Sequence, residues 1–218
     1  MSVRDQFTRQ ELEAIRLATR EAEKETGGEL VCVIVNRCDT YQAPFWQAAA
    51  LGAIGGAVIA GLWYGFREAW FPRPLFWILL PPILGAALSL LPVSLLASVR
   101  RWLIPPQILK RRVDRREAAA FLDEEIFNTR DRTGVLLFVA LFEHQIRILT
   151  DSGIDQRVPE ERWQSIADRL TGDLRSGNPG GAIVEAIRAC GNLLSEHRVT
   201  RREDDQNELG DEPRLLDE

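Results

Sequence analysis

Thiols and imidazoles are scarce in this sequence. Its 218 residues include three cysteines and two histidines. Cys32, Cys38 and Cys190 form no Cys-x-x-Cys pair and are odd in number, so neither a disulfide framework nor a zinc site is indicated. Three free thiols are typical of a reducing compartment. His144 and His197 stand in no motif, which argues against a histidine metal pair or a Ser-His-Asp triad.

Several recognisable motifs are also missing. Residues 1–10 carry charges but no apolar core segment, so no secretory signal peptide is predicted. The sequence contains no Cys-x5-Arg, no Asp-x-Asp and no glycine-rich loop of the P-loop type. It therefore offers no complete catalytic set at motif spacing.

Charge is absent from two long stretches. Residues 40–66 and 74–99 contain no Asp, Glu, Lys or Arg. Each stretch exceeds the roughly 20 apolar residues that an α-helix needs to cross a bilayer. Buried core helices are the alternative, but they are rarely apolar on every face for this length. We therefore predict a transmembrane hairpin over residues 44–100, with spans at about 45–64 and 75–99. No ionisable residue lies inside either span, which argues against a transporter or proton pathway.

The predicted hairpin interrupts a single soluble domain. Residues 1–43 are too few to bury a core of their own, but together with residues 101–202 they make one ordinary domain. Residues 203–218 form an acidic tail that is poor in apolar residues, and we expect this tail to be mobile.

The soluble residues show helix and strand patterns in turn. Thr8 and Glu11 make a capping box for a first helix. Residues 29–36 and 135–142 are almost continuously apolar, as in strands that are covered on both faces. Residues 145–151 alternate, and we expect them to pair with the preceding strand as an antiparallel hairpin. Further helices are predicted over about 106–129, from residue 159, and over about 182–197. This order predicts an α/β fold, a three-layer α/β/α sandwich with an inserted transmembrane helical hairpin.

Basic residues crowd the exit of the second predicted span. They are Arg100, Arg101, Lys110, Arg111, Arg112, Arg115 and Arg116, opposed by Asp114 and Glu117. This bias predicts a two-span protein of the inner (cytoplasmic) membrane with both termini in the cytoplasm. A basic cluster beside a membrane attracts anionic lipid head groups. Nucleic acid is the other polyanion that such a cluster suits, but the adjoining spans favour lipid, so no nucleic-acid partner is predicted.

The first predicted span carries two small-residue motifs. They are Gly52-x-x-x-Gly56 and Gly61-x-x-x-Gly65. Small residues four apart let helix backbones approach closely in lipid. The sequence leaves open whether these glycines pack against the second span or against another copy of the chain.

Several short motifs resemble the TPM-domain family in their order and spacing. They are Thr26-Gly27-Gly28-Glu29-Leu30, Arg132-Thr133-Gly134-Val135-Leu136-Leu137, Ile146-Arg147-Ile148, Asp151-Ser152-Gly153-Ile154, Trp163, Gly177 with Gly180-Gly181, and Asp205-Gln206-Asn207-Glu208-Leu209. The likeness covers about residues 7–40 and 105–212. It implies an α/β/α sandwich. Members of this family have been credited with acid-phosphatase-like activity or calcium binding, and others with assembly, repair or modulation of membrane complexes. Many are secreted and tethered by a terminal span, a pattern from which this chain departs.

Carboxylates near strand ends are the candidates for chemistry. A phosphatase would use Asp151 with Glu29, backed by Glu143 or Asp155, and a metal or backbone amides would hold the phosphate. Calcium or another divalent metal would draw on Asp151, Asp155, Asp204, Asp205 and Glu208. In the structural alternative, Asp151 caps the turn at Gly153 and Glu29 is a solvated charge at a strand edge.

We therefore expect a membrane-anchored, non-enzymatic interaction or assembly module at the cytoplasmic membrane face. Its expected partners are membrane lipid and either another membrane protein or a second copy of the chain, and no cofactor is expected. The alternative is a weak metal-dependent phosphatase that uses carboxylates at strand ends.

Overall fold

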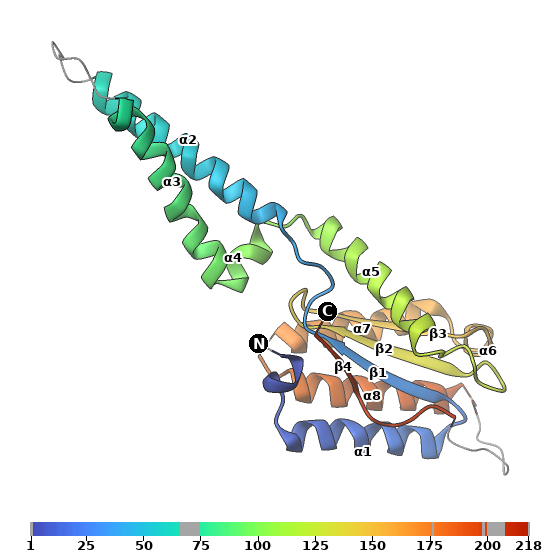
Figure 1. Cartoon of the computed structure of the whole chain (residues 1–218). Coiled ribbons are helices and arrows are strands. Elements are labelled where there is room, and N and C mark those ends of the chain that lie inside the picture. Colours follow the sequence, from blue (N-terminus) through green and yellow to red (C-terminus); the bar gives the residue numbers. More distant parts are fainter. Residues whose placement is uncertain (1, 66–74, 176, 198, 200–207, 218) are drawn as a thin grey trace. The chain divides into compact units, whose positions relative to one another are not determined.

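The computed structural model describes residues 2–65, 75–175, 177–197, 199 and 208–217. It divides into two compact units (Figure 1). The first unit contains residues 1–39 and 110–218, and the second contains residues 40–109.

A four-stranded sheet with the strand order β3-β2-β1-β4 forms the centre of the first unit. Strands β1 (Glu29–Val35), β2 (Gly134–Ala140) and β4 (Arg214–Leu216) are parallel, and β3 (Gln145–Thr150) is antiparallel to β2. The predicted antiparallel hairpin is thus confirmed. Every residue of β1 and β2 is buried, as their continuous apolar runs indicate.

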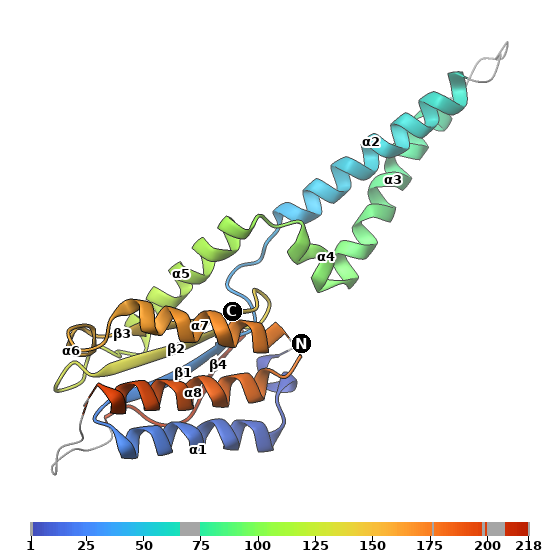
Figure 2. The same ribbon diagram turned by 180° about the vertical axis from the view of Figure 1, so that it is seen from behind.

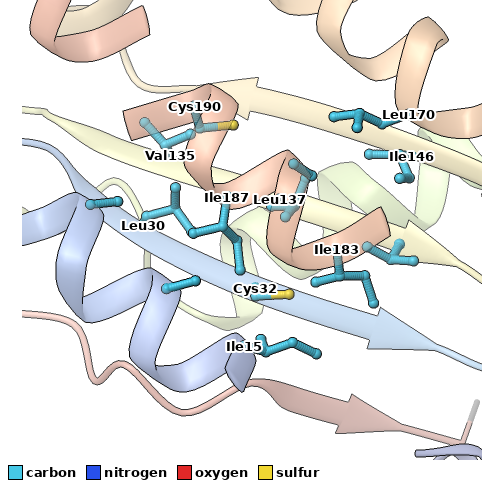
Figure 3. Packing of buried hydrophobic residues seen from close by; sticks show 14 of the residues in the cluster. Ile15, Leu30, Cys32, Val135, Leu137, Ile146, Leu170, Ile183, Ile187 and Cys190 are labelled. Atoms are coloured by element: carbon cyan, nitrogen blue, oxygen red, sulfur yellow. The ribbon is translucent and has the colours of Figure 1, made fainter. Parts of the chain in front are cut away.

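Three helices cover one face of this sheet: α1 (Arg9–Glu25), α7 (Glu160–Arg175) and α8 (Pro179–Glu196) (Figures 1 and 2). Leu30 of β1 and Leu137 of β2 belong to one core cluster with Ile183 and Ile187 of α8 (Figure 3). Helix α1 begins at the predicted capping box, because the hydroxyl of its N-cap residue Thr8 accepts the third helical N–H at 3.2 Å.

The other face of the sheet packs against α5 (Pro106–Asp123). Val113 and Ala120 of this helix share a second core cluster with Leu136 and Phe138 of β2. Neighbouring residues of one strand thus enter different clusters, as the two-residue period of a strand requires. The helix is shorter than the predicted 106–129, because the chain turns at Glu125, whose φ is +51°. This unit is therefore a mixed α/β fold.

The sequence patterns do not predict three short elements, which are η1 (Val3–Gln6), α6 (Ser152–Asp155) and strand β4. Within the tail that we expect to be mobile, residues 208–217 include strand β4 and make hydrogen bonds to the rest of the first unit. Asn36 donates its N–H to the Leu216 carbonyl at 3.1 Å, and Asp217 accepts the Val3 N–H at 2.6 Å. Three residues are too few to show a strand period, and residues 214–216 become a strand because they pair with the edge of β1.

The second unit contains α2 (Ala43–Gly65), α3 (Leu75–Leu95) and the short α4 (Ala97–Trp102). Helices α2 and α3 are long and apolar enough to cross a membrane, and only 17% and 6% of the residues in their apolar windows are buried. Helix α3 stops before the predicted residue 99, because Leu96 has extended backbone angles and α4 begins after it. The predicted turn between the spans lies outside the described residues.

Glycines bring α2 and α3 together. A Cβ atom on Gly52 would collide with the carbonyl oxygen of Gly85, and one on Gly56 would collide with that of Pro81. The Ser89 hydroxyl donates to the Ala48 carbonyl at 2.7 Å across the same contact. Of the two alternatives left open by the sequence, the first motif therefore packs within the chain. Gly61 and Gly65 have no described atom within 4 Å of where a Cβ would stand.

Candidate functional site

The two predicted catalytic carboxylates lie at the same end of the sheet. Glu29 is the first residue of β1 and is in register with Gly134 of β2. Asp151 follows β3, and its N–H donates to the Gly134 carbonyl at 2.9 Å. Strand β2 stands between them, so their backbones are about 10 Å apart.

The backbone of residues 124–133 fills the space over this end of the sheet. A Cβ atom on Gly134 would collide with the carbonyl oxygen of Ile126. One on Gly153 would collide with the carbonyl oxygens of Asp131 and Arg132, and the Gly153 N–H donates to Arg132 at 3.0 Å. Both glycines allow this close approach because they have no side chain.

Asp151 holds the start of α6, as the structural alternative predicts. Its Oδ1 accepts the Ser152 N–H at 2.6 Å and the Ser152 hydroxyl at 3.2 Å. Its Oδ2 lies 3.6 Å from the Arg132 guanidinium and is a buried atom without a hydrogen-bond donor among the described residues. Asp155 accepts the Thr150 hydroxyl. These two carboxylates therefore organise the end of β3.

The C-terminal segment returns to the same end of the sheet. Glu29 accepts the Leu209 N–H at 3.4 Å, and Glu208 accepts the Arg130 N–H at 2.9 Å. Glu29 is only 7% exposed, so its interpretation as a solvated strand-edge charge is wrong. Leu209 stands 180 residues after Glu29 in the sequence, and no local pattern predicts their contact.

Glu23 of α1 is an acid that the sequence analysis missed. Its carboxylate accepts the Leu30 N–H at 3.1 Å. The pKa of Glu23 is raised to about 9, mainly by burial and in smaller part by the nearby carboxylates Glu29 and Asp211, although the Leu30 N–H lowers it. At neutral pH this side chain is protonated. The local signal is helical spacing, because Glu23 lies four residues after the buried Thr19 and eight after the buried Ile15 of α1.

Metal ligands do not converge among the residues that the structure describes. No three His, Cys, Asp or Glu side chains in this part of the chain are placed to hold a metal ion. Asp151, Asp155 and Glu208 each bond to a different partner. Asp204 and Asp205 lie outside the described residues, so the calcium site that would use them stays a prediction.

Glu143 lies at the opposite end of the sheet, so its predicted role behind Asp151 is wrong. It stands in the turn between β2 and β3, and the six residues of β3 separate the two acids by about 20 Å. Glu143 accepts the Cys38 N–H at 2.8 Å and is 2% exposed. Burial and the Glu143 carboxylate raise the pKa of the Cys38 thiol, which therefore stays protonated and is a poor nucleophile.

Comparison with protein families agrees with the motifs. Residues 108–193, from α5 to α8, match the family model of the TPM domain. This chain contains a TPM domain. The match includes Asp151 and Asp155 but not β1, which carries Glu29.

A solved structure supports the fold of the TPM domain. The NMR structure of BA42 protein from the psychrophilic bacterium Bizionia argentinensis is similar over 95% of this chain and 94% of that chain, with a TM-score of 0.55 and 18% sequence identity. At this identity the likeness shows the fold alone. No curated protein matches the chain.

The predicted basic cluster is divided between the two units. Arg100 and Arg101 belong to α4 of the second unit, where the Arg100 guanidinium lies 5.5 Å from the centre of the Phe45 ring. That distance is typical of a cation–π contact.

The other five basic residues belong to α5 of the TPM domain. Arg112 forms an ion pair with Asp39 at 2.8 Å, and Arg116 lies 3.9 Å from Asp123. The three that are exposed and form no ion pair among the described residues are Lys110, Arg111 and Arg115. The tertiary structure thus divides these basic side chains into two groups. Arg112 and Arg116 lie beside carboxylates of the same unit, and the other three face solvent.

Proposed function

We propose that this chain is an integral protein of the inner (cytoplasmic) membrane whose TPM domain is a non-enzymatic interaction or assembly module at the cytoplasmic face. The carrying observation is the exposed apolar surface of α2 and α3. Leu51, Ile59 and Leu88, for example, are 65%, 67% and 64% exposed. A soluble protein rarely leaves so large an apolar surface in water, whereas lipid covers it at no cost.

The tryptophans of α2 support the membrane anchor. Trp46 and Trp63 are 75% and 61% exposed and stand near opposite ends of this helix. They are about 26 Å apart along the helix axis, close to the roughly 30 Å of a bilayer's hydrocarbon core. Tryptophan side chains settle at both membrane–water interfaces.

The absence of catalysis is proposed from the contacts of the candidate carboxylates. Asp151, Glu29 and Glu208 each accept a backbone N–H. Carboxylates used in this way stabilise loops and helix starts.

The two core clusters on opposite faces of the sheet support the three-layer α/β/α sandwich that we propose for this domain.

Membrane extraction and purification in mild detergent test this proposal. We expect the full chain to stay in the membrane after alkaline carbonate washing, and to purify with a defined membrane partner or as a homo-oligomer. A chain released by carbonate would contradict the anchor. A strictly monomeric particle without a partner would contradict the interaction module.

A weak metal-dependent phosphatase is the second candidate function. It is favoured by the position of Glu29 and Asp151 at one end of the sheet and by the buried Oδ2 of Asp151. The test measures phosphate release by the full chain in detergent with Mg²⁺, Ca²⁺ or Mn²⁺, for the wild type, Asp151→Asn and the control Asp168→Asn on α7. The module predicts no metal-stimulated release. Release that Asp151→Asn abolishes and Asp168→Asn keeps would establish the phosphatase.

A further inference from the structure

Helix α5 carries a basic ridge that faces away from the sheet. Its buried side chains include Val113, Glu117 and Ala120. At 100° per residue, the opposite side of the helix is formed by four other residues. They are Arg111, Arg115, Ala118 and Leu122, here called the outer ridge, and all four are exposed.

The carboxylates near the outer ridge are already paired with other arginines. Asp114 lies 3.4 Å from the Arg147 guanidinium, and Asp39 lies 2.8 Å from that of Arg112. Arg111 and Arg115 have no ion pair among the described residues. Among the described residues, no carboxylate thus pairs with these two guanidinium groups on the exposed ridge.

Leu122 adds an apolar side chain to this charge. It is 63% exposed and lies on the same ridge, two helical turns after Arg115. At a membrane surface, arginines can contact the lipid phosphates while a neighbouring aliphatic side chain contacts the apolar region below them. A nucleic-acid backbone would bind the arginines but would give Leu122 no apolar contact.

We propose that the outer ridge of α5 binds the anionic head groups of membrane lipids. The guanidinium groups of Arg111 and Arg115 donate to lipid phosphate oxygens, whose geometry suits the planar donor fork of arginine. Leu122 packs against the glycerol and upper acyl region. The inference rests on the proposed membrane anchor. Arg111 follows the end of α3 by about 16 residues in the sequence. Basic residues this close to a span can interact with the anionic lipids of the adjoining leaflet.

Lipid binding by the full chain in detergent tests this inference. Native mass spectrometry would count the molecules of phosphatidylglycerol or phosphatidylcholine that the protein retains. We expect phosphatidylglycerol to bind better, and the double variant Arg111→Gln/Arg115→Gln to weaken its binding about tenfold. The matched control, Arg20→Gln/Arg169→Gln, removes two exposed arginines from α1 and α7 and is expected to bind as the wild type does.

Three further readouts keep the outcomes separate. If the double variant and the control lose phosphatidylglycerol binding equally, the outer ridge is not the binding site. The same conclusion follows if RNA oligonucleotides bind the wild type and displace the lipid. The melting temperature of the double variant should match the wild type, since both side chains are exposed. Carbonate washing distinguishes the two proposals. If the chain stays in the membrane but the double variant binds lipid as the wild type does, only the inference about the outer ridge is contradicted.

Discussion

Glu23 couples the stability of the first unit to pH. Its pKa rises from the ordinary 4.5 to about 9 in the folded chain, mainly because it is buried. The folded state therefore keeps a proton that the unfolded state loses. The contribution is complete below pH 4.5 and is lost as pH rises toward 9. Glu117 of α5 acts in the same sense up to pH 7, since burial raises its pKa to about 7.

Replacing Glu23 by glutamine should flatten this pH dependence. The amide keeps an acceptor for the Leu30 N–H but has no proton to lose. Glu23 alone should lower the stability of the wild type between pH 5 and 9 by up to about 1.4 kcal/mol per pH unit, and Glu23→Gln should lack this share of the loss. Melting temperatures of the full chain in detergent at several pH values measure this. The control Glu25→Gln changes an exposed acid of the same helix, and an equal flattening there would contradict the assignment.

Gly134 shows how one missing side chain determines the candidate site. The Ile126 carbonyl stands where a Cβ would be, so Gly134→Ala should force this loop away and destabilise the domain by about 1–3 kcal/mol. The control Gly172→Ala on α7 meets no described atom within 4 Å and should stabilise its helix by up to about 1 kcal/mol. Thermal unfolding measures both changes. Equal effects of the two substitutions would mean that residues 124–133 do not press on β2.

Strand β4 and the pair of helices α2 and α3 depend on contacts between residues that are distant in the sequence. Strand β4 hydrogen-bonds to β1 although about 180 residues separate them. Helices α2 and α3 approach each other at Gly52, Gly56 and Gly85. In lipid such contacts depend on small residues, because the hydrophobic effect does not drive helices together there.

The α2–α3 contact predicts different outcomes for two glycines of one helix. Gly52→Ala places a Cβ against the Gly85 carbonyl and should lower the melting temperature of the full chain in detergent. Gly61→Ala meets no described atom within 4 Å and should leave it unchanged or raise it. If Gly61→Ala instead breaks up a purified homo-oligomer, that glycine packs between copies of the chain.

At the scale of the whole molecule, the residues of the second unit are inserted in sequence between two parts of the first unit. The chain leaves the first unit after Asp39 and returns to it at Lys110. Both connections of the second unit therefore lead to the first unit, which contains the residues that match the TPM domain.

A topology experiment tests this arrangement across the membrane. Reporters placed after Glu218 and inserted near residue 68, between α2 and α3, should lie on opposite sides, with the C-terminal one in the cytoplasm. The reason is the excess of arginine and lysine that follows α3. Reporters on the same side would contradict a two-span hairpin. A variant with the α5 arginines replaced is the matched comparison, since losing the positive charge should mix the two orientations.

The sequence by itself determined the features that depend on neighbouring residues. The Thr8 capping box, the buried strands, the β2–β3 hairpin and the apolar helices each follow from a pattern within a short window. Asp151 as a helix cap belongs with them, because its partner is the next residue.

Only the tertiary structure decided which charged side chains face solvent and which are paired or buried. Glu23 meets Asp211, Asp39 takes Arg112 away from the basic cluster, and β4 forms because β1 offers an edge. The physical reason is the same in each case. A hydrogen bond or ion pair between distant residues depends on how the chain folds back on itself. Residue types and local periodicity do not predict which distant residues this folding brings together.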